Sequence, residues 1–337
     1  ETEMRINFIV DFIIVLHHDS HSEEAKNFNS STWSFLQQAR MHARAGLPIF
    51  DAHCHLQDPR IVNALPSLLE AATRTGVKWF AVNGTSEDDW EEVKKLSEQH
   101  NEIIPCFGLH PWYVERRSNQ WFERLRSMLE GVPTAAVGEA GLDKGARGKE
   151  ISIAVQVDVL KQQLMLAKEL QRPISLHCVR AFGELQETLK ELGPFPHGAI
   201  LHSFLGSAEM VQPLAKQGAF FSFSGFLTAL SAKKAKKMLQ EVPLDRILIE
   251  TDAPDAVPKV EPSSLMWVPG DANAPAQLSD AGKVEDISSQ ALNHPANIKT
   301  VLTYVASMKG IEEDTVASAA YRNAKQLFTY PGSKIRA

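Results

Sequence analysis

Cysteine is scarce in this sequence of 337 residues. The three cysteines are Cys54, Cys106 and Cys178, and no two of them form a C-x-x-C pair. Disulfide-stabilised domains carry a denser set of cysteines, and zinc ribbons use closely spaced pairs. The sequence therefore excludes both classes and favours a reducing compartment. We expect a cytoplasmic or nuclear protein, with organelle targeting by the N-terminal residues as the alternative.

Long apolar runs are also missing. The one membrane-like stretch, residues 8–16, contains Asp11 and is far shorter than the ~20 apolar residues that a spanning helix needs. Glu1 and Glu3 stand where a secretory signal carries basic residues, and no small-residue cleavage site follows. We therefore expect no contact with a membrane.

The sequence has no excess of positive charge. Its 35 Lys and Arg residues stand against 41 Asp and Glu residues, which gives a formal net charge of -6. A protein whose whole surface holds nucleic acid would be basic, so any such contact here must be local. The apolar fraction of 44% and charged fraction of 23% exclude a disordered or collagen-like chain and permit a large buried core.

The chain divides into a short extension and one long regular domain. Residues 1–46 combine a short apolar run, several histidines and a polar stretch, and we expect a poorly ordered extension with a helix over 33–43. Residues 47–330 alternate apolar runs of strand length with longer amphipathic segments, such as 156–170 and 182–192. This alternation is typical of consecutive βα units.

Eight strands are expected in this domain. They are residues 49–52, 79–82, 103–107, 135–137, 173–176, 199–201, 219–222 and 247–249. Eight βα units in series are the number that closes a parallel barrel, so we predict a single-domain TIM (β/α)8 barrel, with an open doubly wound sheet as the alternative. An irregular stretch over 253–293 and two helices over 295–308 and 312–328 follow.

Histidines and carboxylates fall at the carboxyl ends of these expected strands. The candidate metal ligands are His53, His55, Glu139, His177, His202 and Asp252. In a barrel these ends meet at one rim, which is where active sites of this fold lie. A single strand-end histidine is more often structural, but this many together are an improbable coincidence.

Four imidazoles and two carboxylates suit borderline divalent metals and exceed what one four-coordinate ion can use. We expect two ions that share Glu139, with glycines at 138 and 141 allowing a close approach of the backbone. Glu139 and Asp252 are the expected catalytic residues, and Asp252 would hold one ion and accept a proton from water. Asp143 is expected to cap the next helix.

Several motifs in this region resemble those of the TatD family of metal-dependent deoxyribonucleases. The matching segments are residues 51–55, 108–111, 137–143, His177 with Arg180, His202 with Ser203 and Gly206, 222–225 and 250–254. The resemblance runs in order from about residue 49 to 328. It implies a TIM barrel, two divalent ions of the magnesium or zinc type, and exonucleolytic hydrolysis of DNA in repair or in DNA breakdown.

The resemblance also implies an allocation of ligands. The first metal takes His53, His55, Glu139 and Asp252, and the second takes Glu139, His177 and His202. Two positions depart from the usual pattern: Arg180 comes one residue later than the family arginine, and His294 replaces a glutamate in Asn293-His294-Pro295.

The expected partner is a DNA end, including single-stranded ends. Candidate substrate contacts are His110, Arg180, Lys144 and Arg147, all in loops after the third to fifth strands. For His110 a scaffold role is the equal alternative, and the loop cations have the alternative of ordinary solvated charges. Trp112, Tyr113 and Trp267 would stack on unpaired bases or pack within the loops. Lysines at 233, 234, 236 and 237 favour a solvated helix face.

Two other functions remain open at this point. The same ions would also activate water for hydrolysis of an ester or amide, such as an aminoacyl-tRNA. A barrel that only binds its ligand is the third hypothesis, although the complete set of metal-ligating residue types speaks against it.

Overall fold

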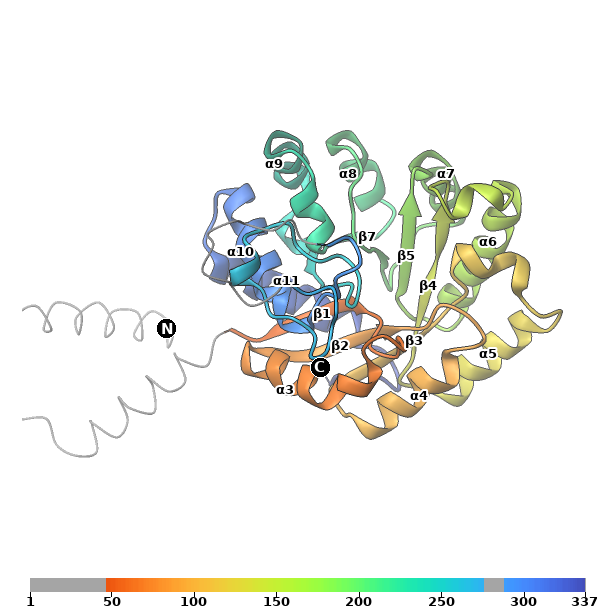
Figure 1. The fold of residues 1–337 in the computed structure, drawn as a ribbon. Coiled ribbons are helices and arrows are strands. Elements are labelled where there is room, and N and C mark those ends of the chain that lie inside the picture. The colour runs from red at the N-terminus through yellow and green to blue at the C-terminus, as the bar shows by residue number, and fades with distance from the viewer. Residues whose placement is uncertain (1–46, 276–287, 337) are drawn as a thin grey trace, which may run out of the picture. The chain divides into compact units, whose positions relative to one another are not determined.

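The computed structural model describes residues 47–275 and 288–336. Eight parallel strands form one sheet in the order β1 to β8, with helices around the outside (Figure 1). The strands are β1 (Ile49–Cys54), β2 (Val77–Asn83), β3 (Ile103–Phe107), β4 (Ala136–Asp143), β5 (Ile174–Val179), β6 (Ala199–Leu201), β7 (Ala219–Phe223) and β8 (Ile247–Ile249). The TIM barrel expected from the sequence is confirmed.

The barrel is completed between β8 and β1 just beyond the end of β8. The N–H of Asp252 donates to the carbonyl of His53 at 2.9 Å, and the N–H of His55 donates to the carbonyl of Ala253 at 2.7 Å. These bonds join the two strands that are farthest apart in sequence. They also place His53 and His55, at the end of β1, beside Asp252, which follows β8.

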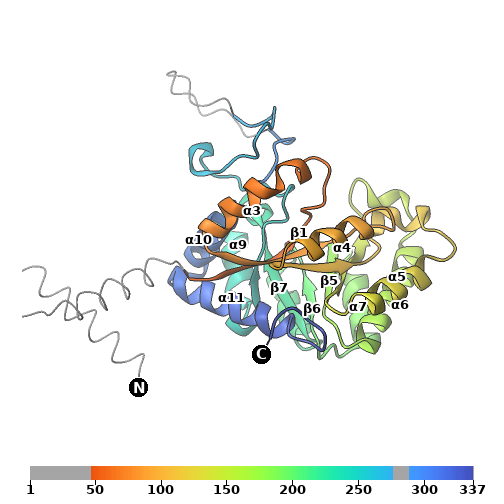
Figure 2. The same ribbon diagram turned by 90° about the horizontal axis from the view of Figure 1, so that it is seen from below.

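The helices cover the outer surface of the sheet in both views (Figures 1 and 2). They are α3 (Leu65–Arg74), α4 (Trp90–Gln99), α5 (Trp121–Gly131), α6 (Ile153–Glu169), α7 (Phe182–Leu192), α8 (Ala208–Ala215), α9 (Ala232–Glu241), α10 (Ile298–Lys309) and α11 (Glu313–Leu327). Each buries a stripe of apolar residues against the strands. In α3, for example, Leu65, Leu68 and Leu69 are buried.

Short 3-10 helices extend several of the loops. They are η2 (Val62–Ala64), η3 (Pro111–Arg116), η4 (Gly148–Glu150), η5 (Gly225–Ala229), η6 (Leu244–Arg246), η7 (Pro262–Ser264) and η8 (Pro295–Asn297). Proline at the first position begins η3, η7 and η8, because its fixed φ suits a helix start.

The core has two layers, which follow from the alternation of side chains along each strand. Ile103 and Phe107 of β3 pack against the helices, whereas Ile104 and Cys106 belong to a second cluster inside the barrel. Phe328, which follows α11, joins this inner cluster and stacks on Phe50 with ring centroids 5.0 Å apart. The apolar filling below the rim keeps the polar groups of the barrel at its carboxyl end.

The expected strands are all present, and those over 103–107, 199–201 and 247–249 have the expected bounds. The fourth is the most different, because β4 extends to Asp143 instead of ending at Val137. The expected extension over 1–46 and its helix lie outside the described residues. Within the part that the structure describes, no helix has the length and apolar character needed to cross a membrane.

Candidate metal centre

Two of the expected ligands lie where a strand leaves its regular pairing. The register of β1 against β2 shifts between Asp51 and Cys54, around His53, and that of β4 against β5 shifts between Val137 and Ala140, around Glu139. Such bulges turn a side chain away from the direction that strict alternation gives. His53, Glu139 and His177 are thus inside their strands, and not after them as expected from the sequence.

The close approach at Gly141 serves the neighbouring strand. Its φ is +149°, and a Cβ at this position would overlap the backbone oxygen of His177. A glycine is therefore required for β4 and β5 to pair where they carry Glu139 and His177. From the sequence we expected this glycine to let the backbone approach an ion. Its lack of a side chain instead lets β4 lie against the backbone of β5.

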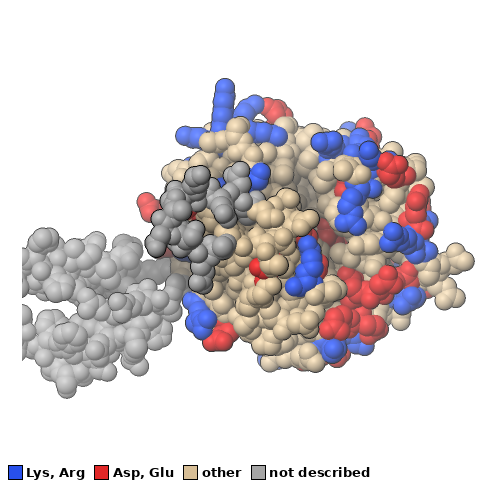
Figure 3. Space-filling model, viewed as in Figure 1, with Lys and Arg blue, Asp and Glu red and all other residues tan. Residues whose placement is uncertain are grey.

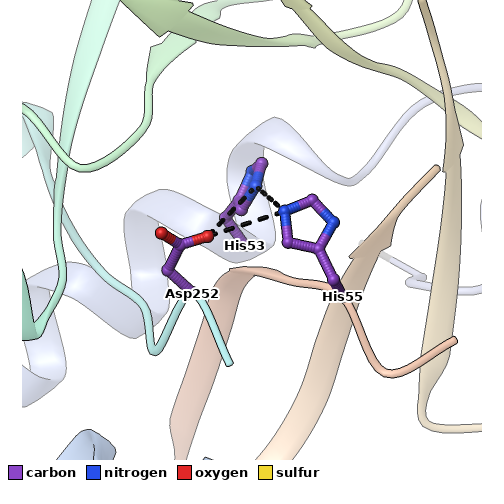
Figure 4. A group of neighbouring side chains, drawn as sticks. All are labelled: His53, His55 and Asp252. Atoms are coloured by element: carbon purple, nitrogen blue, oxygen red, sulfur yellow. Dashed lines mark hydrogen bonds and ion pairs between the residues drawn. The ribbon is translucent and has the colours of Figure 1, made fainter. Parts of the chain in front are cut away.

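The first half of the centre joins the end of β1 to the segment after β8 (Figure 4). The Nε2 atoms of His53 and His55 are 3.3 Å apart. The Oδ1 atom of Asp252 lies 3.8 Å from His53 Nε2 and 3.6 Å from His55 Nε2. Glu139 Oε2 lies 3.5 Å from His53 Nε2 and 3.3 Å from His55 Nε2. Four side chains thus direct one atom each toward a common point.

The second half uses the other oxygen of the same glutamate. Glu139 Oε1 lies 3.1 Å from His177 Nδ1 and 2.9 Å from His202 Nε2. These two nitrogens are 3.2 Å from each other. Glu139, which is buried, therefore contacts both pairs of histidines, and its role as a ligand shared by two ions stays a prediction.

Hydrogen bonds on the outer side of the rings set which nitrogen carries the proton. His55 Nδ1 lies 2.7 Å from the carbonyl oxygen of Asn83, which can only accept a hydrogen bond. His177 Nε2 faces Asp143 Oδ2 at 3.2 Å, and His202 Nδ1 faces a Glu250 oxygen at 3.4 Å. In neutral His55 and His177 the proton is therefore on the outer nitrogen, and the inner nitrogen carries a lone pair.

The inner atoms of the centre are consequently acceptors that face one another. Lone pairs of His55 and His177 face the oxygens of Glu139, which have no proton to offer when ionised, and the inner nitrogen of His202 lies 2.9 Å from the same carboxylate. Such a cluster is stable only if a proton or a cation lies between the acceptors. Imidazole nitrogens and carboxylate oxygens are the ligands that borderline divalent ions take, so the residues fit a metal site.

The pKa values of these side chains also indicate that the cluster is stabilised by positive charge. Burial lowers the pKa of His55, but the hydrogen bond and charge of Glu139 outweigh burial and raise it to about 9. Burial would raise the pKa of Glu139, but the charges of His110 and His202 hold it well below its ordinary value. Burial raises the pKa of Asp252 to about 7 and lowers that of His53 to about 4. Metal binding would replace protons on the histidines.

His110 is close to the centre but directs a hydrogen toward it. Its Nδ1 accepts a hydrogen bond from the N–H of Trp112 at 3.1 Å, so the neutral ring carries its proton on Nε2. That Nε2 faces Glu139 Oε1 at 3.4 Å, and the side chain is buried. Although His110, Glu139 and His177 lie close enough to hold an ion, this tautomer directs an N–H of His110, and not a lone pair, toward Glu139.

The other expected substrate contacts lie in the loops beyond β4 and β5. Lys144 pairs with Glu184 at 2.6 Å. The guanidinium of Arg147 lies over the ring of Trp112, 3.9 Å from its centroid. Arg180, which follows β5, is exposed. Contact of these cations with a substrate stays a prediction.

Sequence reasoning missed the residues that orient the ligands. Asp143 is not a helix cap, because it is the last residue of β4 and contacts His177 and, at 2.5 Å, the indole N–H of Trp112. Glu250 is fully buried and faces His202. The sequence did contain a signal for Glu250. It stands two residues before Asp252, at the end of a buried strand, where a carboxylate is costly to bury without a partner.

A comparison with known proteins places these observations in context. The family model described as TatD related DNase matches residues 50–329. The uncharacterized metal-dependent hydrolase YjjV of Escherichia coli is 29% identical over 283 residues, which are 83% of this chain and 98% of YjjV. Its crystal structure superimposes with a TM-score of 0.69 and 27% identity, covering 84% of this chain and 98% of that one.

Two relatives carry the name of an activity. The human protein named deoxyribonuclease TATDN3 is 28% identical over 295 residues, covering 84% of this chain and 96% of the relative. The protein named 3'-5' ssDNA/RNA exonuclease TatD from Erwinia tasmaniensis is 24% identical over 282 residues, covering 83% of this chain and 99% of the relative.

Proposed function

Because this chain belongs to the TatD related DNase family, we propose that it is a metal-dependent nuclease that hydrolyses phosphodiester bonds at the end of a DNA strand. It is a hydrolase acting on ester bonds, as the relatives named as nucleases indicate. The 3' end is the proposed point of attack, in line with the name of the Erwinia relative.

One observation carries the proposal. The inner nitrogens of His55, His177 and His202 lie 2.9–3.3 Å from the two oxygens of Glu139, and the outer nitrogens of His55 and His177 are hydrogen-bonded to oxygen acceptors. A structural cluster of histidines would pair donors with acceptors. This arrangement is suited instead to holding cations at the end of the barrel where TIM-barrel enzymes act.

Two divalent ions fit the number and placement of the ligands. His53, His55, Glu139 and Asp252 would hold the first, and Glu139, His177 and His202 the second. Such ions, when bound, supply positive charge to the phosphoryl oxygens and lower the pKa of water. The four imidazoles favour zinc, because magnesium prefers oxygen ligands; magnesium is the alternative.

The chain's own groups then have separate tasks. Glu139 holds the two halves together, because each of its oxygens faces one pair of histidines. Asp252 approaches the centre through Oδ1 alone in the contacts that the structure gives, so we assign it the acceptance of a proton from the attacking water. His110 Nε2 lies 3.4 Å from Glu139 Oε1, and we assign His110 the positioning of that carboxylate.

The test combines metal analysis with a time course of cleavage. The purified protein is treated with chelator, reloaded with Zn²⁺, Mn²⁺ or Mg²⁺, and incubated with single-stranded DNA, duplex DNA and RNA labelled at the 5' or the 3' end. We expect metal-dependent release of mononucleotides and a loss of at least about a hundredfold in Glu139→Gln and Asp252→Asn. Cleavage that persists in both variants would refute the proposal.

A further inference from the structure

An exposed aromatic ring lies in the loop that follows β7, at the end of the barrel that carries the metal centre. Phe226 lies in η5, directly after β7, and is 43% exposed. Ser224, which precedes η5, is hydrogen-bonded through its hydroxyl to that of Ser203 at 2.6 Å, and Ser203 follows His202 in the chain. The strands on either side of β7 lead to His202 and Asp252. Phe226 thus presents an apolar face to solvent at the rim of the barrel.

The helix that follows η5 carries a concentration of positive charge. In α9 the buried residues are Ala235, Met238 and Leu239, and the four lysines at 233, 234, 236 and 237 are exposed. Figure 3 shows Lys and Arg side chains gathered over this helix at the top of the view. Lys237 pairs with Glu209, whereas the other three have no ion-pair partner within residues 47–275 and 288–336.

The position of two of these lysines opposes the electrostatics of the helix. Lys233 and Lys234 occupy the first turn of α9, which contains no acidic residue. The N-terminus of a helix carries a partial positive charge, so cations in the first turn are repelled by it. A bound anion would remove this repulsion. Local conflicts of this kind tend to mark functional positions.

A further cation comes from the loop after β8. The N–H of Lys259 donates to the hydroxyl of Thr228, in η5, at 2.7 Å. This bond fixes the Lys259 backbone beside the 3-10 helix that carries Phe226, and its side chain is exposed. Cations therefore lie in the segments on both sides of η5.

We propose that Phe226, Lys233, Lys234 and Lys259 form a binding site for a single nucleic-acid strand that extends from the metal centre. The ring of Phe226 stacks on an unpaired base, and the three ammonium groups contact phosphates of the same strand. The proposal rests on the proposed nuclease function. It adds a preference for strands that are longer than the nucleotide being removed.

The chemistry of the site matches a single strand better than a duplex. Proteins that bind single strands combine cations along the backbone with aromatic rings on which bases stack. A base in a duplex has its faces covered by its neighbours and offers none to Phe226. Because the net charge is -6, contact with a polyanion depends on local groups of cations such as this one.

The test separates strand binding from chemistry. Binding of a fluorescein-labelled phosphorothioate dodecamer of deoxythymidine is measured by anisotropy across a salt series, with the metal-loaded full chain. Hydrolysis of bis(4-nitrophenyl) phosphate, which has no further nucleotides to bind along a strand site, reports on the metal site alone. The variants are Phe226→Ala, Phe226→Trp and Lys233→Ala/Lys234→Ala. The control is Lys94→Ala/Lys95→Ala on α4, which removes the same charge elsewhere.

Phe226→Ala is expected to weaken dodecamer binding by at least about fivefold, with Phe226→Trp retaining it. The double lysine variant is expected to reduce the log–log salt slope by about 1.4, and the control to leave it unchanged. Hydrolysis of the small ester should stay within about twofold of wild type, since the variants leave every metal ligand in place.

Unchanged dodecamer binding, a parallel loss of small-ester hydrolysis, or equal affinity for a blunt duplex would overturn the proposed strand site. If the wild type hydrolyses neither DNA nor the small ester with any metal, the proposed nuclease function fails instead. The binding measurement would then still decide whether the strand site exists.

Discussion

The carboxylate of Asp51 accepts two hydrogen bonds from Thr251, a residue 200 positions later in the chain. The N–H of Thr251 donates at 2.9 Å and its hydroxyl at 2.5 Å, and all these groups are buried. The contact joins β1 to the end of β8 one residue before Asp252. The contact between Asp51 and Thr251 therefore helps both to close the barrel and to place the metal ligands.

Loss of the Asp51 carboxylate should destabilise the fold. In Asp51→Ala two buried donors of Thr251 lose their acceptor, and we expect the free energy of unfolding to fall by roughly 2–4 kcal/mol in urea titrations. Burial raises the pKa of Asp51 to about 8, and Asp51→Asn, which keeps an oxygen acceptor for Thr251 without a charge to bury, should cost less. Asp245→Ala, at an exposed carboxylate, serves as the control. Equal stability of Asp51→Ala and wild type would contradict this role.

Metal ions should stabilise the protein as well as activate it. An ion that binds the folded state at 100 times its dissociation constant adds about 2.7 kcal/mol to the free energy of unfolding. We therefore expect the melting temperature to rise on addition of Zn²⁺ or Mn²⁺ and to fall again with chelator. Glu139→Gln removes the ligand shared by both halves and should lose most of this response. A similar rise in the variant would place the ions elsewhere.

Asp143 should control metal affinity through the tautomer of His177. An amide in Asp143→Asn can donate to His177 Nε2, which would move the ring proton to Nδ1 and direct it at Glu139. We expect calorimetry to show metal affinity 10- to 100-fold lower at this half of the centre. Trp112→Phe removes only the indole N–H from Asp143 and should change affinity far less. An unchanged affinity in Asp143→Asn would show that Asp143 does not orient His177.

His294 should make stability depend on pH below neutrality. The side chain is buried, its Nδ1 accepts the N–H of Ala296 at 2.9 Å, and burial lowers its pKa to about 4. In the unfolded chain the His294 ring binds a proton near pH 6.5, whereas in the folded chain it binds one only near pH 4. The free energy of unfolding therefore falls as the pH drops from 6.5 towards 4.

The expected size is about 1.4 kcal/mol per pH unit below pH 6.5, or roughly 2 kcal/mol by pH 5. His294→Asn keeps an acceptor for Ala296 and removes the titration, so its stability should fall less than that of wild type over this range. His197→Asn, at a half-buried loop residue, provides the matched control. Identical pH profiles of wild type and His294→Asn would rule out this contribution.

The sequence allowed prediction of the barrel because the period of its apolar runs is a local property. The runs at 103–107, 199–201 and 247–249 are bounded by polar or turn residues, and the strands have these bounds. It did not predict the bulges around His53 and Glu139, since a bulge depends on the register between two strands. The end of β4 was misplaced for the same reason.

The metal-ligand candidates were predictable in kind and in approximate place, because parallel strand ends meet at one rim. The groups that orient them were not. Asn83 acts on His55 through its backbone carbonyl, which any residue would supply, and Asp143 follows a glycine-rich segment that reads as a loop. Such contacts join distant segments and leave no periodic pattern in the sequence.

The most direct test of the metal centre is anomalous diffraction from crystals of the full chain soaked with Zn²⁺ or Mn²⁺. We predict two peaks that share Glu139, one also within about 2.0–2.2 Å of His53, His55 and Asp252, and the other within that distance of His177 and His202. A single peak would contradict the shared carboxylate. An empty cluster at saturating metal, or ions bound only elsewhere, would contradict the assignment of these residues as a metal centre.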